Sequence, residues 1–361
     1  MSLLATRLQN WRVSNPQLDK NMARACEYGA LDFFISQTNA PDSLIGANLR
    51  DKAFASMGNT VQVPVLNYDE NVVVANARTC VITDDENTSA LYEITWVTYQ
   101  VGFTMVPALY MNNEISYEQD FNRKLMKVSR ALANELDKAA VAALEANKTQ
   151  VFKDLLYYQE DGNDIQVPWD MRNDILSDTN TLMRANCYPG KIHVIGNAGV
   201  DSMLRKQAQL GLYNEVNKRL EFEDKIVHFT NNIVNEGGKF GSFYAVEAGN
   251  VGVLTRVDRE ALRRARVAGH EWDVVRLPFV NLPVGSHYYT AVGDQSGIAG
   301  AASADLTCAA KEYFGFSVDV AFIVAYNSNP ADVANPIIKA EVASSASAVP
   351  TAMPVYVVNQ A

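Results

Sequence analysis

Histidine is the side chain best suited to acid–base chemistry near neutral pH, and it is also a common metal ligand. The sequence has four histidines, which lie far apart: His193, His228, His270 and His287. No two of them have the spacing of a metal-binding motif, and His270-Glu271 lacks the second histidine of an HExxH zinc site. A surface or hydrogen-bonded structural role is therefore the main interpretation of each one. The alternative is an enzyme of an unfamiliar α+β class that uses His193 or His270 with nearby acids.

Other catalytic motifs do not occur in the sequence. No GxGxxG phrase follows a predicted strand, there is no Walker A phosphate-binding sequence, and the glycines around Ser296 are misplaced for a GxSxG nucleophile elbow. The four cysteines never form a CxxC pair, which disfavours a disulfide scaffold and a zinc ribbon; they are Cys26, Cys80, Cys187 and Cys308. We expect no catalytic, cofactor-binding or metal-binding residues, no cofactor and no enzyme activity.

Two charged clusters could instead take part in recognition. Asp84, Asp85 and Glu86 could hold a calcium ion, but their spacing is not that of an EF-hand, and a solvated hairpin tip is favoured. The basic cluster has three open interpretations, namely an exposed helix face with salt bridges, a patch that meets acidic residues of an adjacent copy, and a nucleic-acid contact. It lacks the interleaved aromatic residues of a single-strand binder. Its members are Arg256, Arg259, Arg263, Arg264 and Arg266.

The composition limits the class of protein. The chain has 361 residues, 48% of them hydrophobic and 20% charged, which allows two to three folded domains. Its formal net charge of −10 makes it a poor non-specific binder of DNA, because phosphate binding needs surplus Lys and Arg. No segment has the roughly 18 uninterrupted apolar residues of a membrane span, and the first residues become polar too early for a secretory signal. We expect synthesis in a cytosol.

Long alternating segments predict a projecting ribbon. Residues 58–66 form one predicted strand, with Pro64 at an edge or irregularity. Residues 92–106 form a second, in which the apolar parity of Tyr92, Ile94 and Trp96 changes near residues 97–98, as at a β-bulge. Residues 58–106 therefore predict one long hairpin. Because an isolated two-stranded ribbon is marginal in water, we expect neighbouring copies to cover its apolar surface, with Tyr92, Ile94 and Trp96 at the contact.

A long amphipathic helix follows the ribbon. Ser116 and Gln119 form a capping box, and apolar residues then recur every three or four positions to residue 147. Helices are also predicted at 168–185, 198–210 and 258–268, a buried strand at 191–196, and short strands through most of 225–325. Helices and strands occur in blocks, so the expected class is α+β. The Ala-, Ser- and Val-rich tail after Asn329 is expected to be a flexible or extended extension.

The order of these features resembles the major capsid (coat) proteins of tailed double-stranded DNA bacteriophages. The family phrase G-(N/D)-T-V-x-(V/I)-P is similar to Gly58-Asn59-Thr60-Val61-Gln62-Val63-Pro64, and the end of the family's long helix is similar to a phrase that holds Leu132, Leu136, Asp137 and Val141. The resemblance is clearest over residues 50–150 and weaker over 151–330. It implies six segments: an N-terminal arm (1–55), an extended loop or β-hairpin (56–110), a peripheral domain (111–190) with spine helix 116–147, an axial domain (191–300), return strands to the peripheral domain (301–330) and a C-terminal extension (331–361).

The same resemblance implies a structural function in a virion. Many copies would form hexamers and pentamers of an icosahedral shell that encloses DNA without reading its sequence, with portal and scaffolding or decoration proteins as partners and no membrane. The expected subunit-interface residues are Tyr92, Ile94, Trp96, Asp84, Asp85, Glu86, Arg259, Arg263 and Arg264. A cellular protein-shell compartment of the encapsulin type, with the same fold, is the alternative.

Overall fold

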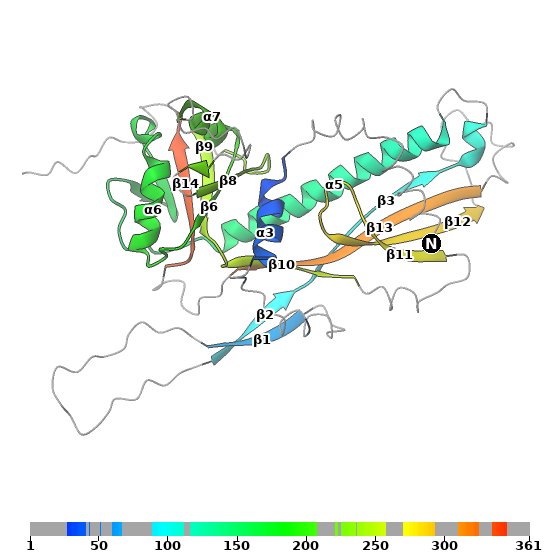
Figure 1. The fold of residues 1–361 in the computed structure, drawn as a ribbon, viewed down its shortest axis with the longest axis horizontal. Coiled ribbons are helices and arrows are strands. Elements are labelled where there is room, and N and C mark those ends of the chain that lie inside the picture. Colours follow the sequence, from blue (N-terminus) through cyan, green and yellow to red (C-terminus); the bar gives the residue numbers. More distant parts are fainter. Residues whose placement is uncertain are drawn as a thin grey trace, which may run out of the picture.

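The molecule is elongated and consists of two sheet-containing bodies and one projecting ribbon (Figure 1). The structure is a computed structural model, and it describes residues 27–40, 43, 51, 60–66, 89–111, 116–207, 221–222, 225–235, 237–257, 270–292, 310–324 and 334–344. The helix α5 (Tyr117–Ala146) runs along one body and ends at the other. The mixture of helices and sheets confirms the predicted α+β class.

The predicted long helix is confirmed almost to the residue. Ser116 caps α5, since its hydroxyl oxygen accepts from the Gln119 backbone N–H at 3.2 Å while the Gln119 side chain accepts from the Ser116 N–H. The 30 residues of α5 span roughly 45 Å at about 1.5 Å per residue. Its buried face includes the predicted Phe121, Leu125, Leu132 and Leu136. It also buries three polar residues, Asp120, Ser129 and Asp137, together with Met126, Ala133, Ala140 and Leu144.

A five-stranded antiparallel sheet lies beside α5. The 15-residue strand β13 (Ala310–Val324) is central and pairs with three others. Phe103, Phe121 and Phe314 join the sheet to the helix, with ring centroids 5.0 to 5.4 Å apart. The remaining strands are β3 (Val97–Met105), β10 (Val251–Arg256), β11 (His270–Arg276) and β12 (Pro283–Val292). The short helix η1 (Pro107–Tyr110) links β3 to α5.

A seven-stranded sheet forms the core of the second body. Every residue of β6 (Ile192–Gly196) is buried, as the sequence predicts. In spatial order the strands are β4 (Gln159–Asp161), β5 (Asp164–Val167), β14 (Ile337–Ala343), β9 (Lys239–Glu247), β6, β8 (Lys225–Phe229) and β7 (Glu221–Phe222). Apolar residues of α6 (Ile175–Ala185) and α7 (Ala198–Gln207) pack in this core. The predicted helix 168–185 is divided into η2 (Trp169–Met171) and α6.

The ribbon is shorter than the predicted hairpin 58–106. Strand β1 (Thr60–Leu66) pairs only with β2 (Ser89–Thr95), over seven residue pairs, and the chain then breaks its pairing at Trp96 before entering β3. The change of parity predicted near residues 97–98 is therefore confirmed. However, β3 belongs to the five-stranded sheet of its own body, because it pairs with β13 from Val97 to Met105. The prediction that 97–106 continues the ribbon is wrong.

The two bodies do not follow the predicted domain boundaries. Residues 159–185, expected in the peripheral domain, belong to the seven-stranded body, whereas β10, β11 and β12, expected in the axial domain, belong to the five-stranded sheet. Of the two alternatives for the segment after Asn329, flexible or extended, the flexible one is wrong for residues 337–343, because β14 is a fully buried strand between β5 and β9. Alternation in sequence could not reveal this strand, since all seven residues are buried. The predicted helix 258–268 lies outside the described residues.

Candidate functional site

The ribbon is anchored to its own chain by the residues that were predicted to meet a neighbour. Ile94 and Trp96 are only 4% and 5% exposed. They pack with Val61 against the five-stranded sheet, at Leu254, Ala321 and Ile323. The Arg256 guanidinium lies 5.1 Å from the centre of the Trp96 ring and also pairs with Asp319 at 3.0 Å. The prediction that Ile94 and Trp96 contact a neighbouring copy is thus corrected, because both side chains face the five-stranded sheet of their own chain.

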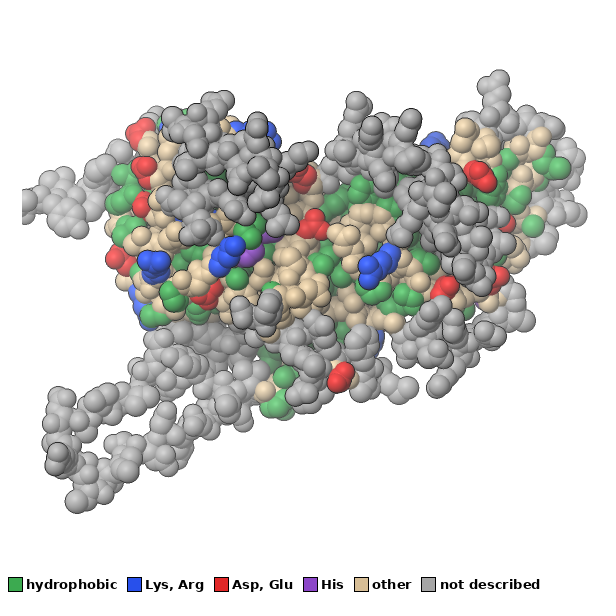
Figure 2. Space-filling model, viewed as in Figure 1, with side chains coloured by type: hydrophobic (Ala, Val, Ile, Leu, Met, Phe, Trp, Pro, Cys, Tyr) green, Lys and Arg blue, Asp and Glu red, His purple; other side chains and the backbone are tan. Residues whose placement is uncertain are grey.

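The opposite face of the ribbon is open. Leu91 is 65% exposed and lies opposite Pro64 in the β1–β2 register. Val97, where β3 begins, is 49% exposed. Tyr92 is half-buried beside Val63. Figure 2 shows hydrophobic side chains on the described part of the ribbon, at the lower edge of the molecule. The sequence could have indicated this face, because Leu91 and Ile94 are an odd number of residues apart in one strand and therefore point to opposite sides.

The two predicted charged clusters lie outside the described residues. They are the acidic run Asp84, Asp85 and Glu86 and the arginines Arg259, Arg263 and Arg264. Their role as subunit contacts stays a prediction.

A buried carboxylate joins the two bodies to the helix α3 (Gly29–Thr38). Asp137 of α5 is fully buried and accepts from the Leu31 backbone N–H at 2.9 Å, in the first turn of α3. It also accepts from the Thr230 hydroxyl and, at 2.7 Å, from the Asn232 amide, both just after β8. Tyr28 at the N-cap provides no side-chain cap, so Asp137 serves as the cap from another element, where a negative charge is favoured. Asp137 is the aspartate of the helix phrase noted in the sequence.

A second joint fixes the end of α5 to the seven-stranded sheet. Lys339 of β14 contacts Asp164 at 2.8 Å, Glu341 at 3.1 Å and Glu145 of α5 at 3.4 Å. Lys148 contacts Glu145 at 2.8 Å and also pairs with Asp164. This network, which we call the ion joint, therefore links α5, β5 and β14 through two ammonium groups and three carboxylates.

The ion joint stabilises the charged forms of its members. Burial alone would lower the pKa of Lys339, but hydrogen bonds and attraction from Asp164 and Glu341 outweigh it and raise that pKa. Burial would likewise raise the pKa of Glu341, yet hydrogen bonds from Gln166 and Lys339 hold it below its usual value. The pKa of Glu145 is lowered in the same way by Lys148 and Tyr244. Each charge is thus compensated by its neighbours.

The four histidines meet in two pairs that sequence spacing did not predict. His193 Nδ1 lies 3.1 Å from His228 Nε2, and His270 Nδ1 lies 2.6 Å from His287 Nε2. His287 also stacks on Trp272, with centroids 3.7 Å apart. Register explains both pairs, since β6 pairs with β8 and β11 pairs with β12. Within the part of the chain that the structure describes, no group of three or more His, Cys, Asp or Glu residues could hold a metal ion.

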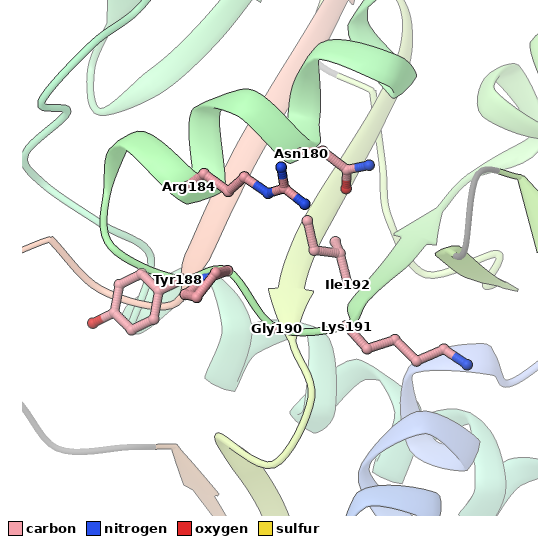
Figure 3. Close-up of a pocket in the computed structure, with 7 residues that line it drawn as sticks. Asn180, Arg184, Tyr188, Gly190, Lys191 and Ile192 are labelled. Carbon is pink, nitrogen blue, oxygen red and sulfur yellow. The ribbon is translucent and has the colours of Figure 1, made fainter.

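A pocket of about 400 Å³ opens between α6 and the start of β6. Figure 3 shows Arg184 and Asn180 side by side on α6, while Lys191 extends away from them. The two cations do not converge, so they do not fix a position for an anion. Cys187, beside this pocket, is an exposed free thiol, and the other three cysteines lie outside the described ranges. No helix in the described ranges is long and apolar enough to cross a membrane.

Several solved structures are similar to this chain in backbone course. One described as "Mycobacterium phage Bobi" has a TM-score of 0.48 and 12% identity, with 92% of this chain and 95% of that chain covered. "Capsid structure of the Cyanophage P-SCSP1u" has a TM-score of 0.44 and 12% identity, with 80% and 82% covered. "Capsid of native GTA particle computed with C5 symmetry" has a TM-score of 0.43 and 13% identity, with 85% and 95% covered. No protein-family model and no curated protein matches the sequence.

Proposed function

We propose that this chain is the major capsid protein of a tailed double-stranded DNA bacteriophage. Its copies assemble into hexamers and pentamers of an icosahedral shell that encloses packaged DNA. The observation that carries the proposal is the β1–β2 ribbon, which leaves the body with one face anchored and the other open. The resemblance of residues 58–64 and of α5 to the coat-protein family is the second support for the proposal.

The open face of the ribbon needs a partner. Seven residue pairs correspond to a ribbon of roughly 24 Å at about 3.4 Å per residue. Two strands without a third layer are marginal in water, and among the described residues the chain itself covers the face that holds Val61 and Ile94, while Leu91 on the other face is exposed. A second copy that covers Leu91 and Pro64 would complete the burial. A heterologous contact of this kind closes into rings, as hexamers and pentamers require.

The two joints suit a subunit that must keep its shape in a shell. Asp137 and the ion joint connect α5 to the seven-stranded body at two separate places. A contact made by the ribbon therefore acts on a subunit whose two bodies are held together at two places. This supports a structural role for the chain rather than a catalytic one.

The charge of the chain agrees with the enclosure of DNA. A net charge of −10 keeps the shell subunit from binding the genome phosphates non-specifically, because like charges repel over about a Debye length. We propose virion localisation, with portal and scaffolding or decoration proteins as further partners. An encapsulin-type cellular compartment would have the same subunit geometry but would not contain packaged DNA.

The test is the assembly state of the full chain. We expect large particles or capsomer rings by electron microscopy and sedimentation velocity. The Leu91→Asp variant places a charge on the open ribbon face, and we expect it to reduce the assembled fraction at least about tenfold. Val234→Asp is the matched control, because Val234 is 83% exposed on the other body. A wild-type chain that stays monomeric at high concentration in assembly buffers would refute the proposed function, and nuclease-protected DNA in phage-derived particles separates the phage shell from the cellular compartment.

A further inference from the structure

The helix α3 bridges the two bodies, and each end of it has different partners. Its first turn binds Asp137 of α5, and near its C-terminal end the Thr38 hydroxyl accepts from the Val253 N–H of β10 at 2.7 Å. Gln37 makes a hydrogen bond from α3 to the seven-stranded sheet. Its side chain is 4% exposed and lies between the β9–β10 turn and His193 of β6.

The hydrogen bonds of Gln37 fix its orientation. The Gly249 backbone N–H can only donate, so the Gln37 oxygen that accepts from it at 2.8 Å is Oε1. The amide nitrogen of Gln37 then faces His193 Nε2 at 3.4 Å and donates to it. His193 Nε2 is therefore unprotonated, and the proton of the neutral ring is on Nδ1. From there it is donated to His228 Nε2, 3.1 Å away.

The series of hydrogen bonds from Gly249 through Gln37 and His193 to His228 cannot take up another proton without losing a contact. A proton on His193 Nε2 would face the Gln37 NH₂ group, so that two donors would meet. Turning the Gln37 amide around would direct its NH₂ group at the Gly249 N–H instead. A proton on His228 Nε2 would force the His193 proton to Nε2, with the same conflict at Gln37. Protonation of His193 Nε2 or His228 Nε2 therefore breaks at least one hydrogen bond of this series.

We propose that Gln37, His193 and His228 form a proton-sensitive latch, which holds α3 on the seven-stranded sheet and is weakened when either imidazole is protonated. Phe33 of α3 packs over both rings, with centroids 5.0 Å from His193 and 5.4 Å from His228. His228 also lines a cavity of about 460 Å³ beside Glu27, Asp32 and Phe279, which gives solvent protons a route to the pair.

The charged groups around the latch define its pH range. Burial, and then the positive charge of Lys191, lower the pKa of His193 to about 4. The acids on the surrounding elements are Glu27 and Asp32 at α3, Asp137 on α5 and Glu247, which lies opposite Ile192 in the β9–β6 pair. Both imidazole contacts of His193 in the latch are to neutral groups. An opened latch would regain an ordinary histidine pKa of about 6.5, so opening is favoured progressively as pH falls from about 6.5 to about 4.

Hydrogen exchange of the full-length protein tests this latch. After correction for intrinsic exchange rates, we expect the amides of residues 31–38 to lose at least about tenfold in protection between pH 7.5 and pH 5.0, while those of α7 do not. His193→Gln should remove this response, and His287→Gln, in the other histidine pair, should keep it.

The Gln37→Glu variant should reverse the effect of pH on the hydrogen-exchange protection of α3. A carboxylate at this position can accept from both Gly249 and a protonated His193, so α3 should be better protected at pH 5.0 than at pH 7.5. This arm keeps the test decisive if His193→Gln does not fold. Equal protection of wild-type α3 at both pH values, a loss shared by α7, or the same response in Gln37→Glu as in wild type would each overturn the latch. The measurement concerns one chain, so its outcome is independent of shell formation.

Discussion

The two joints of α5 connect the same two bodies by different chemistry. At Asp137 one carboxylate accepts from three uncharged donors, whereas the three carboxylates of the ion joint face the ammonium groups of Lys148 and Lys339 and, at Glu341, also that of Lys239. The Asp137 carboxylate and its partners Leu31 and Thr230 are buried and Asn232 is half-buried, while Glu145 in the ion joint keeps a side chain that is 42% exposed. A buried donor that loses its acceptor cannot form a hydrogen bond with water instead, whereas an exposed charged group can. The first joint should therefore be less tolerant of substitution than the second.

The largest effect is expected for Asp137→Ala. The variant leaves the Leu31 N–H, the Thr230 hydroxyl and the Asn232 amide without their acceptor. At about 1–3 kcal/mol for each buried donor, and with partial rearrangement, the free energy of unfolding should fall by about 4 kcal/mol. Denaturant unfolding measures it, and Glu135→Ala is the control, since Glu135 belongs to an exposed pair with Lys138. A loss no larger than that of the control would show that Asp137 is not a joint.

A smaller effect is expected for Lys339→Ala. Its removal leaves Asp164 and Glu341, both nearly buried, short of a positive charge, and breaking such a pair costs about 3 kcal/mol. Lys148 and Lys239 remain near these carboxylates and reduce the loss. The matched control is Lys138→Ala, whose exposed pair with Glu135 contributes about 0–1 kcal/mol. If Lys339→Ala destabilised the protein more than Asp137→Ala, the proposed ranking of the joints would be reversed.

The smallest effect is the pH dependence of the ion joint. The pKa values of Glu145 and Glu341 are lowered on folding, so their contribution is present above an unfolded pKa of about 4.5 and is lost as pH falls below it. The pKa of Lys339 is raised, so its contribution persists up to its ordinary pKa of about 10.5. We expect the stability difference between wild type and Lys339→Ala to be constant from about pH 5 to 10 and to shrink below pH 4.5. Urea titrations at pH 7 and pH 3.5 check this, and a difference that grows in acid would contradict it.

Local signals predicted the elements of this fold better than their partners. The Ser116–Gln119 capping box and the apolar spacing fixed α5, and the parity change near Trp96 located the break between β2 and β3. The sequence could not show that β3 joins β13, more than two hundred residues away, or that Ile94 and Trp96 pack on the chain's own sheet. Asp137 was part of a recognisable phrase, but its partners at Leu31 and Thr230 are distant in sequence. Histidine spacing likewise did not reveal the two pairs formed by strand register.

The position of β14 has a consequence for how the chain is made. This strand lies between β5 and β9, yet it follows both of them in the sequence, and β10 to β13 come between β9 and β14. During translation, the edges of β5 and β9 that will bind it remain without this partner until all residues up to and including β14 have been synthesised. Lys339 is part of β14, so Glu145 and Asp164 also lack this cation until β14 has been synthesised. The synthesis of β14 thus sets the earliest moment at which the seven-stranded sheet of this chain can be completed.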